Sequence, residues 1–119
     1  METIEVKISK VIDGGFGVSA HDGQTVYATI AEEISKGNRV VLSFENITRL
    51  TTAFLNAAVG QLYGEYSDQE IRKHLGAPTH AEQWQLSRLK TVVDRAKVYF
   101  KDPASINQIF SEVANSENE

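Results

Sequence analysis

The chain has 119 residues, a formal net charge of −4, 41% apolar residues and 24% charged residues. This length suits one hydrophobic core, and the composition is that of a globular protein. The absence of cysteine excludes disulfides, thiolate zinc sites and cysteine nucleophiles. No apolar run approaches the roughly 18 residues that span a bilayer, and the N-terminus lacks a signal-peptide pattern, so we expect a soluble cytoplasmic protein.

Alternating residues predict a strand at the start of the chain. Ile4, Val6 and Ile8 point one way and polar residues the other, as in a strand that is covered on one face only. The Asp13-Gly14-Gly15 segment tolerates positive φ, so it predicts a hairpin into a second strand at 16–19.

A helix and a buried strand are predicted next. Asp22 is the expected N-cap of a helix that runs to Lys36, and Gly37 is expected to end it. Four apolar residues of this helix keep helical spacing: Val26, Tyr27, Ile30 and Ile34. The β-branched run at 39–44 is typical of the central strand of an α/β sheet, covered on both faces.

The second half is predicted to be mainly helical. Thr51-Thr52 opens a helix that is apolar nearly all round, so it should be the buried helix. Ser67-Asp68 could cap a short helical turn, and Lys73–Ala77 could form a brief strand. A long amphipathic helix is predicted for 81–101, with one apolar stripe: Leu86, Leu89, Val93, Ala96 and Phe100.

This order predicts an α/β fold, a small mixed sheet with helices packed against it, in a single domain over 1–114. Asp102-Pro103 should start a last helix, and the acidic tail at 115–119 is expected to be disordered.

No group of residues has the pattern of a catalytic or metal site. The Gly14-Gly15-Phe16-Gly17 segment lacks the lysine and hydroxyl residue of a phosphate-binding loop, so a turn explains it. His21, His74 and His80 form no spaced ligand pair, and Ser19 beside His21 and Asp22 is a turn and no catalytic triad. We therefore expect no enzyme activity, no metal and no cofactor.

Basic residues gather late in the chain. Residues 71–111 hold seven bases against three acids, but the isoelectric point of the chain is about 5.4. A nucleic-acid-binding domain is usually basic overall. We interpret the run as a solvated helix face with intrahelical pairs such as Asp94–Lys97, and we do not expect nucleic-acid binding.

One stretch resembles a known family. A hydrophobic strand leads into Phe44-Glu45, then Ile47-Thr48, then Thr51-Thr52-Ala53-Phe54 at the start of a helix. This is similar to the bacterial STAS-like domain of unknown function, and more distantly to the STAS domains of anti-sigma-factor antagonists. A later stretch, Leu89 to Ala96, is similar to the last helix of that group, so the resemblance spans about 22–101.

The resemblance implies a STAS-like fold and a non-enzymatic regulatory protein-interaction module. Its partner would be a regulatory kinase or kinase-like ATPase, an anti-sigma factor, or another sigma-factor regulator. In anti-sigma-factor antagonists an Asp-Ser pair opens the equivalent helix and the serine is phosphorylated. Those positions fall at Thr51 and Thr52 here, so the acid is replaced. The expected contact surface, with Thr52 as its phosphorylation candidate, consists of Thr48, Arg49, Thr51 and Thr52.

A second hypothesis is a small-ligand or nucleotide-sensing domain. An anion would bind near the N-terminus of the first helix, where backbone N–H groups are exposed. The residues of this second candidate site are Gly14, Gly15, His21, Asp22 and Gly23. The sequence leaves the oligomeric state open.

Overall fold

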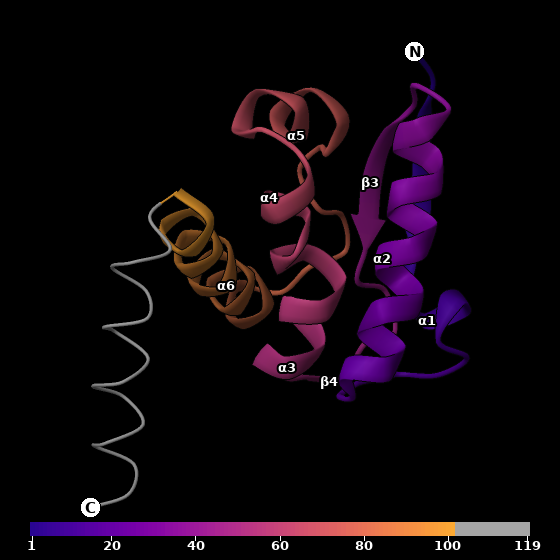
Figure 1. The fold of residues 1–119 in the computed structure, drawn as a ribbon. Helices are drawn as coiled ribbons and strands as arrows, with labels where there is room; N and C mark the ends of the chain where they lie inside the picture. Colours follow the sequence, from indigo (N-terminus) through magenta and orange to yellow (C-terminus); the bar gives the residue numbers. More distant parts are fainter. Residues whose placement is uncertain (102–119) are drawn as a thin grey trace, which may run out of the picture.

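The computed structural model describes residues 1–101 (Figure 1). In chain order the elements are β1 (Thr3–Lys7), α1 (Ile8–Val11), β2 (Phe16–Gly17), α2 (Ala20–Ser35), β3 (Arg39–Ser43), β4 (Arg49–Leu50), α3 (Thr52–Leu55), the π-helical η1 (Asn56–Gly60), α4 (Leu62–Glu65), α5 (Asp68–His74) and α6 (Gln83–Lys101). The α/β class is confirmed, and the helices pack on small parallel sheets. No helix within 1–101 has the length and apolarity that crossing a membrane requires.

β3 lies at the centre of the sheet. β1 pairs with it in parallel, from Thr3 opposite Arg39 to Lys7 opposite Ser43. On the other side of β3, single parallel bridges join Val40 to Leu75 and Ser43 to Thr79. The side chains of Val40, Leu42 and Phe44 are buried, so β3 is covered as its apolar run predicts.

The predicted hairpin between the first two strands is wrong. After Lys7 the chain turns into α1, whose Ile8 is only 1% exposed, so packing of Ile8 in the core carries the chain away from β1. β2 instead pairs in parallel with β4, and Phe16 lies opposite Arg49. All strand pairing within 1–101 is therefore parallel, where the sequence led us to expect a mixed sheet.

The first long helix has the predicted course but another cap. Ser19, and not Asp22, is the N-cap of α2, because its Oγ accepts a hydrogen bond from Asp22 N at 3.0 Å. At the other end Gly37 has φ +81° and donates to Ile34 O, which confirms the glycine end of this helix.

The segment from 52 to 65 is the buried helix, as predicted. Its core residues are Phe54, Leu55, Ala58, Val59 and Leu62. It stands beside α2 at the centre of the molecule (Figure 1). The two backbones come very close at Gly23, where a Cβ would lie 2.4 Å from Phe54 O and 2.7 Å from Ala57 Cβ. The π-helical stretch at 56–60, which the sequence did not predict, lies at this contact.

The short helical turn predicted at Ser67-Asp68 is confirmed as α5. Ser67 caps α5 in a capping box with Glu70, and the helix runs to His74. The predicted strand at Lys73–Ala77 reduces to the bridge at Leu75, followed by the one at Thr79.

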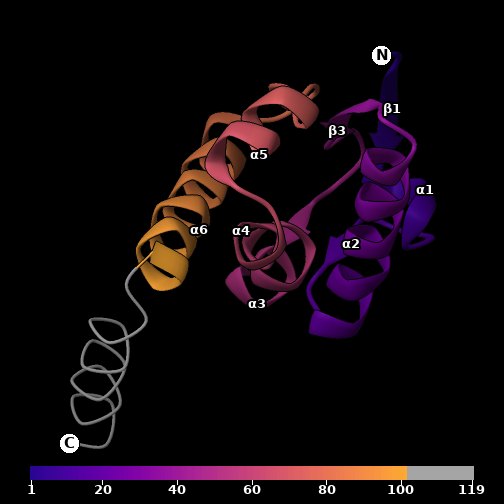
Figure 2. The same ribbon diagram turned by 45° about the horizontal axis from the view of Figure 1, so that its top comes forward.

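α6 confirms the predicted long helix, and Leu89, Val93 and Ala96 of the predicted stripe are buried or partly buried against the core. It lies across the other helices (Figure 2). Its buried residues are Gln85, Val92 and Ala96, whereas Phe100 of the predicted stripe is 40% exposed. The predicted helix after Asp102 and the tail at 115–119 lie outside the described residues.

Candidate functional site

The two sequence-predicted sites lie next to each other. The segment 15–18 runs alongside 48–51, because Thr48 N donates to Gly15 O and Thr51 N to Gly17 O, both at 2.9 Å. Gly15 allows this approach, since a Cβ there would lie 2.6 Å from Asn46 O. The N-termini of α2 and α3 meet at this end of the molecule (Figure 1).

Thr51 and Thr52 have different surroundings. Thr51 Oγ1 accepts a hydrogen bond from Phe54 N at 3.1 Å and donates to Val18 O. Thr51 therefore caps the buried helix and links its start to the backbone of Val18. Thr52 is exposed, and its hydroxyl makes no hydrogen bond to another described residue. The hydroxyl of Thr52 is therefore accessible at the start of the helix, whereas the hydroxyl of Thr51 is engaged in hydrogen bonds that stabilise the fold.

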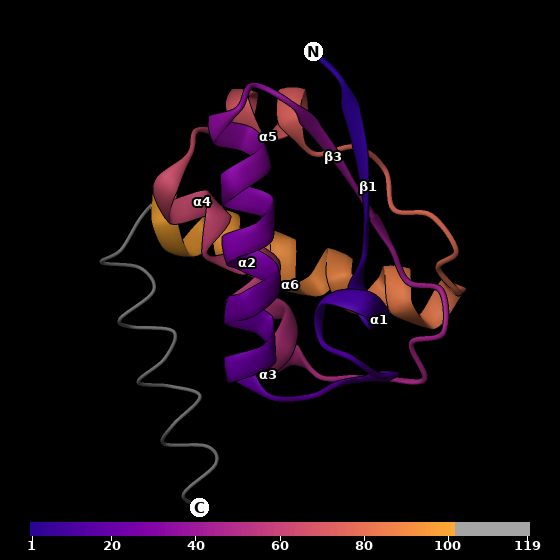
Figure 3. The same cartoon turned by 90° about the vertical axis from the view of Figure 1, so that its right-hand side faces the viewer.

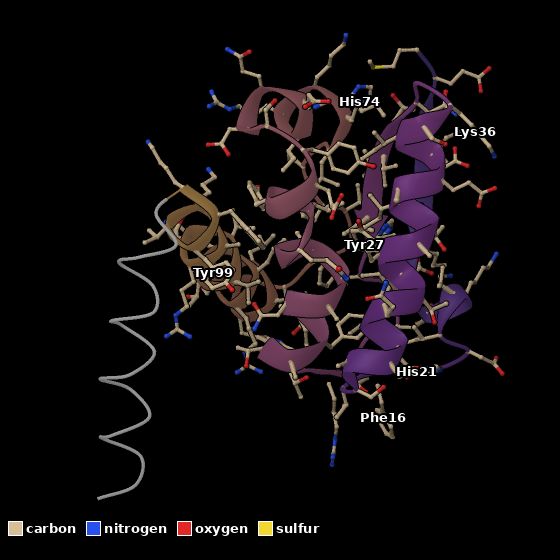
Figure 4. All side chains as sticks on the ribbon, viewed as in Figure 1. Phe16, His21, Tyr27, Lys36, His74 and Tyr99 are labelled. Carbon is tan, nitrogen blue, oxygen red and sulfur yellow. The ribbon has the colours of Figure 1, made fainter. Side chains whose placement is uncertain are left out.

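An aromatic side chain and an arginine cover this end of the molecule. Phe16 is 61% exposed, and the Arg49 guanidinium carbon lies 5.3 Å from the centre of its ring. Phe16 and His21 project from the same end of the molecule (Figure 4). Three further exposed residues lie in or next to the two paired segments. We call the group the Phe16 surface: Phe16, Val18, Thr48, Arg49 and Thr52.

The start of α6 supports the Phe16 surface from behind. Gln85 Nε2 donates to Ile47 O at 2.9 Å, and Arg88 donates to Leu50 O. Arg88 also stacks on Trp84, at 5.5 Å from the ring centre. Segment 47–50 is therefore held between β2 and α6.

Sequence reasoning missed the exposure of Phe16 and Val18, which the hairpin prediction placed in a regular strand. It also missed Gln85, because a polar residue does not count in an apolar stripe. An aromatic residue between two glycines, as in Gly15-Phe16-Gly17, is a signal that could have marked Phe16 as exposed.

A second polar cluster lies where β1 and β3 end. The Oγ of Ser43 is 3.3 Å from His80 Nδ1, and His80 Nε2 is 3.5 Å from Glu45 Oε2. Lys7 Nζ lies 3.1 Å from the other carboxylate oxygen of Glu45. The hydrogen bond to Lys7 and its positive charge hold the pKa of Glu45 below its usual value.

This serine, histidine and glutamate form a structural link. Ser43 is fully buried, so its hydroxyl is closed to a substrate, and it also accepts from Glu45 N at 3.3 Å. His80 has φ +52°, a backbone conformation that this contact helps to hold. The cluster fastens the segment after Thr79 to the end of β3.

The five residues of the predicted ligand site have different structural roles. Gly15 and Gly23 are at close backbone contacts, and Asp22 N is used by the Ser19 cap. Gly14, with φ +155°, lies in an open turn, and His21 is exposed at the start of α2. Ligand binding at this place stays a prediction.

The remaining histidine and the basic face have local partners. His74 Nδ1 lies 2.9 Å from Asn38 O. Within 1–101 no cluster of three or more histidine or acidic residues could hold a metal ion. Asp94 pairs with Lys90 at 2.7 Å rather than with Lys97, whose ammonium lies over the ring of Tyr63.

Comparison with known proteins identifies the central segment. Residues 22–77 match the family model of the STAS-like domain of unknown function. This segment is similar to a STAS-like domain. The relationship suspected from the sequence is thereby confirmed for α2, β3, the buried helix and α5, whereas the similarity at 89–96 lies outside the match. No curated protein and no solved structure gives a significant match.

Proposed function

We propose that the chain is a non-enzymatic regulatory module that binds a protein partner through the Phe16 surface. The observation that carries the proposal is the exposed Phe16 ring stacked against Arg49 at the start of the buried helix. Aromatic residues and arginine are enriched at the energetic centres of protein interfaces. The choice of this helix start also rests on the resemblance to anti-sigma-factor antagonists, in which the phosphorylated serine opens the equivalent helix.

The rigidity of the surface supports the same proposal. Gly15, Gly17 and Thr51 are tied together by backbone and cap hydrogen bonds, and Gln85 holds Ile47 from the other side. A surface that is already ordered loses little conformational entropy when a partner binds. By resemblance, the partner is a regulatory kinase or kinase-like ATPase, or a sigma-factor regulator.

The test begins with site-specific cross-linking in cells that express the chain. A photo-reactive phenylalanine replaces Phe16 in one sample and Val98, which is exposed on α6, in the matched control. A protein captured from position 16 alone is then purified. Its affinity is measured for the native chain and for Phe16→Ala, Arg49→Ala and Val98→Ala.

We expect Phe16→Ala and Arg49→Ala each to weaken binding by about 10-fold or more, as at a hot spot, and Val98→Ala to leave it unchanged. Equal affinity for all four chains contradicts the proposal. Thr52→Asp tests the regulatory part: it should fold normally and lose the partner, while Thr52→Ala should still bind. If neither Thr52 variant changes binding, Thr52 has no switching role.

A further inference from the structure

The outer edge of β1 has no strand beside it within residues 1–101. β1 pairs with β3 on one side only. Figure 3 shows β1 at the outside of the sheet, with α1 at its lower end. An unpaired edge presents a row of backbone donors and acceptors to which another strand can add.

The register shows which backbone groups face outward. Glu2 O accepts from Arg39 N at 2.7 Å, and Ile4 lies opposite Val40. In a parallel ladder, every second residue directs both its N–H and its C=O to the same neighbour. Ile4 and Val6 therefore bond to β3, whereas the N–H and C=O groups of Thr3 and Glu5 point outward.

A groove lies along this edge. It has a volume of about 370 Å³ and lies between β1, α1 and α2. Ile4, Val6 and Val11 supply its apolar lining, and charged residues line its rim. A strand added to β1 would place its own apolar side chains in this groove.

The charges along the edge favour a second copy of the same chain as the occupant. Glu2 precedes β1 and Lys10 follows it in α1, whereas the side chains of Glu5 and Lys7 already contact Thr79 and Glu45. Two antiparallel copies bring the acidic part of each edge to the basic part of the other. Parallel copies would set like charges opposite each other, which is unfavourable.

We propose that β1 pairs antiparallel with β1 of a second copy, which forms a dimer with a two-fold axis and joins the two sheets across the axis. A two-fold axis requires each surface to complement itself, and this edge does so in charge and in backbone groups. The β1 edge is separate from the Phe16 surface, so the dimer would leave that surface open.

The first test is the mass of the full chain in analytical ultracentrifugation over a range of concentrations. The native chain should pass from 13.2 kDa to twice this mass as its concentration rises. Glu5→Pro removes an outward N–H that β3 does not use, so the variant should stay at the monomer mass. Val98→Ser, on the exposed part of α6, is the matched control and should behave like the native chain.

A charge exchange gives a second test that does not disturb the backbone. Glu2→Lys makes the edge mainly basic and Lys10→Glu makes it mainly acidic, so each variant alone should dimerise several-fold more weakly than the native chain. An equimolar mixture of the two should dimerise at least as well as the native chain, and this mixture decides the question if Glu5→Pro fails to fold.

A native chain that stays monomeric at every concentration overturns the proposal, and leaves an extended segment of another protein as the candidate for this edge. A dimer that survives both Glu5→Pro and the charge variants also overturns it, because the interface would then lie elsewhere.

Discussion

Gln85 Nε2 donates a 2.9 Å hydrogen bond to the carbonyl of Ile47, which is 38 residues earlier in the chain. Gln85 is only 1% exposed, and its Oε1 accepts from Glu82 N at 2.8 Å. One buried amide thus fastens the start of α6 to the turn that leads into β4 and the Phe16 surface. The burial of a polar residue is explained by these two bonds.

Gln85→Leu should lower the free energy of unfolding by about 1–3 kcal/mol, because it leaves the buried carbonyl of Ile47 without its partner. Urea denaturation measures the loss. Gln83→Leu, at an exposed position of the same helix, is the control and should change stability little. Equal midpoints for both variants would mean that water replaces the amide at no cost.

Gly23→Ala should destabilise the fold by about 1–3 kcal/mol, because its Cβ would overlap the buried helix. The overlap is with Phe54 O at 2.4 Å and Ala57 Cβ at 2.7 Å. The sign of the change in stability is informative, because replacing glycine by alanine within a helix usually stabilises a protein by about 1 kcal/mol. Thermal unfolding followed by circular dichroism, with the exposed His21→Ala as control, would show a raised melting temperature if the helices do not touch here.

Ala58→Leu should cost about 1–3 kcal/mol through overpacking between the buried helix and its neighbours. Ala58 is 1% exposed, whereas Ala53 on the same helix is exposed. Ala53→Leu is therefore the matched control in chemical denaturation. Identical midpoints for the two variants would place this helix at the periphery.

Thr51→Ala should destabilise the chain by about 1–2 kcal/mol through the loss of a helix cap. The hydroxyl of Thr51 accepts from Phe54 N and donates to Val18 O. Thr52→Ala removes a hydroxyl without a described hydrogen bond and should leave the denaturation midpoint almost unchanged. If Thr52→Ala lost more stability than Thr51→Ala, Thr52 rather than Thr51 would be the helix cap.

The ion pair of Lys7 and Glu45 should make stability depend on pH. Lys7 lowers the pKa of Glu45 in the folded chain, so this pair stabilises fully above the usual glutamate pKa of 4.5. The contribution should disappear as the pH falls through the lowered value. The stability difference between the native chain and Lys7→Met should therefore shrink at acid pH, measured by urea denaturation at several pH values. The exposed Lys73→Met is the control, and a difference that stays constant contradicts the assignment.

Local patterns in the sequence determined where most helices and the central strand lie. Helical spacing placed α2, Gly37 marked its end, the β-branched run marked β3, and the hydroxyl residues marked the start of the buried helix. The STAS-like resemblance was carried by this same stretch. These features depend on residues that are close in the sequence, so a single chain reveals them.

Only the tertiary structure decided which of these elements meet. A Gly-rich turn fits a hairpin as well as the parallel pairing of β2 with β4, and the burial of Ile8 in α1 selects the second. The buried face of α6 keeps Leu89, Val93 and Ala96 of the predicted stripe and adds Gln85, because a distant carbonyl at Ile47 satisfies the buried amide. The contact of Ser43 with His80 likewise joins residues 37 apart in the sequence. Such pairings depend on the free energy of packing and hydrogen bonding between distant segments, which local spacing does not contain.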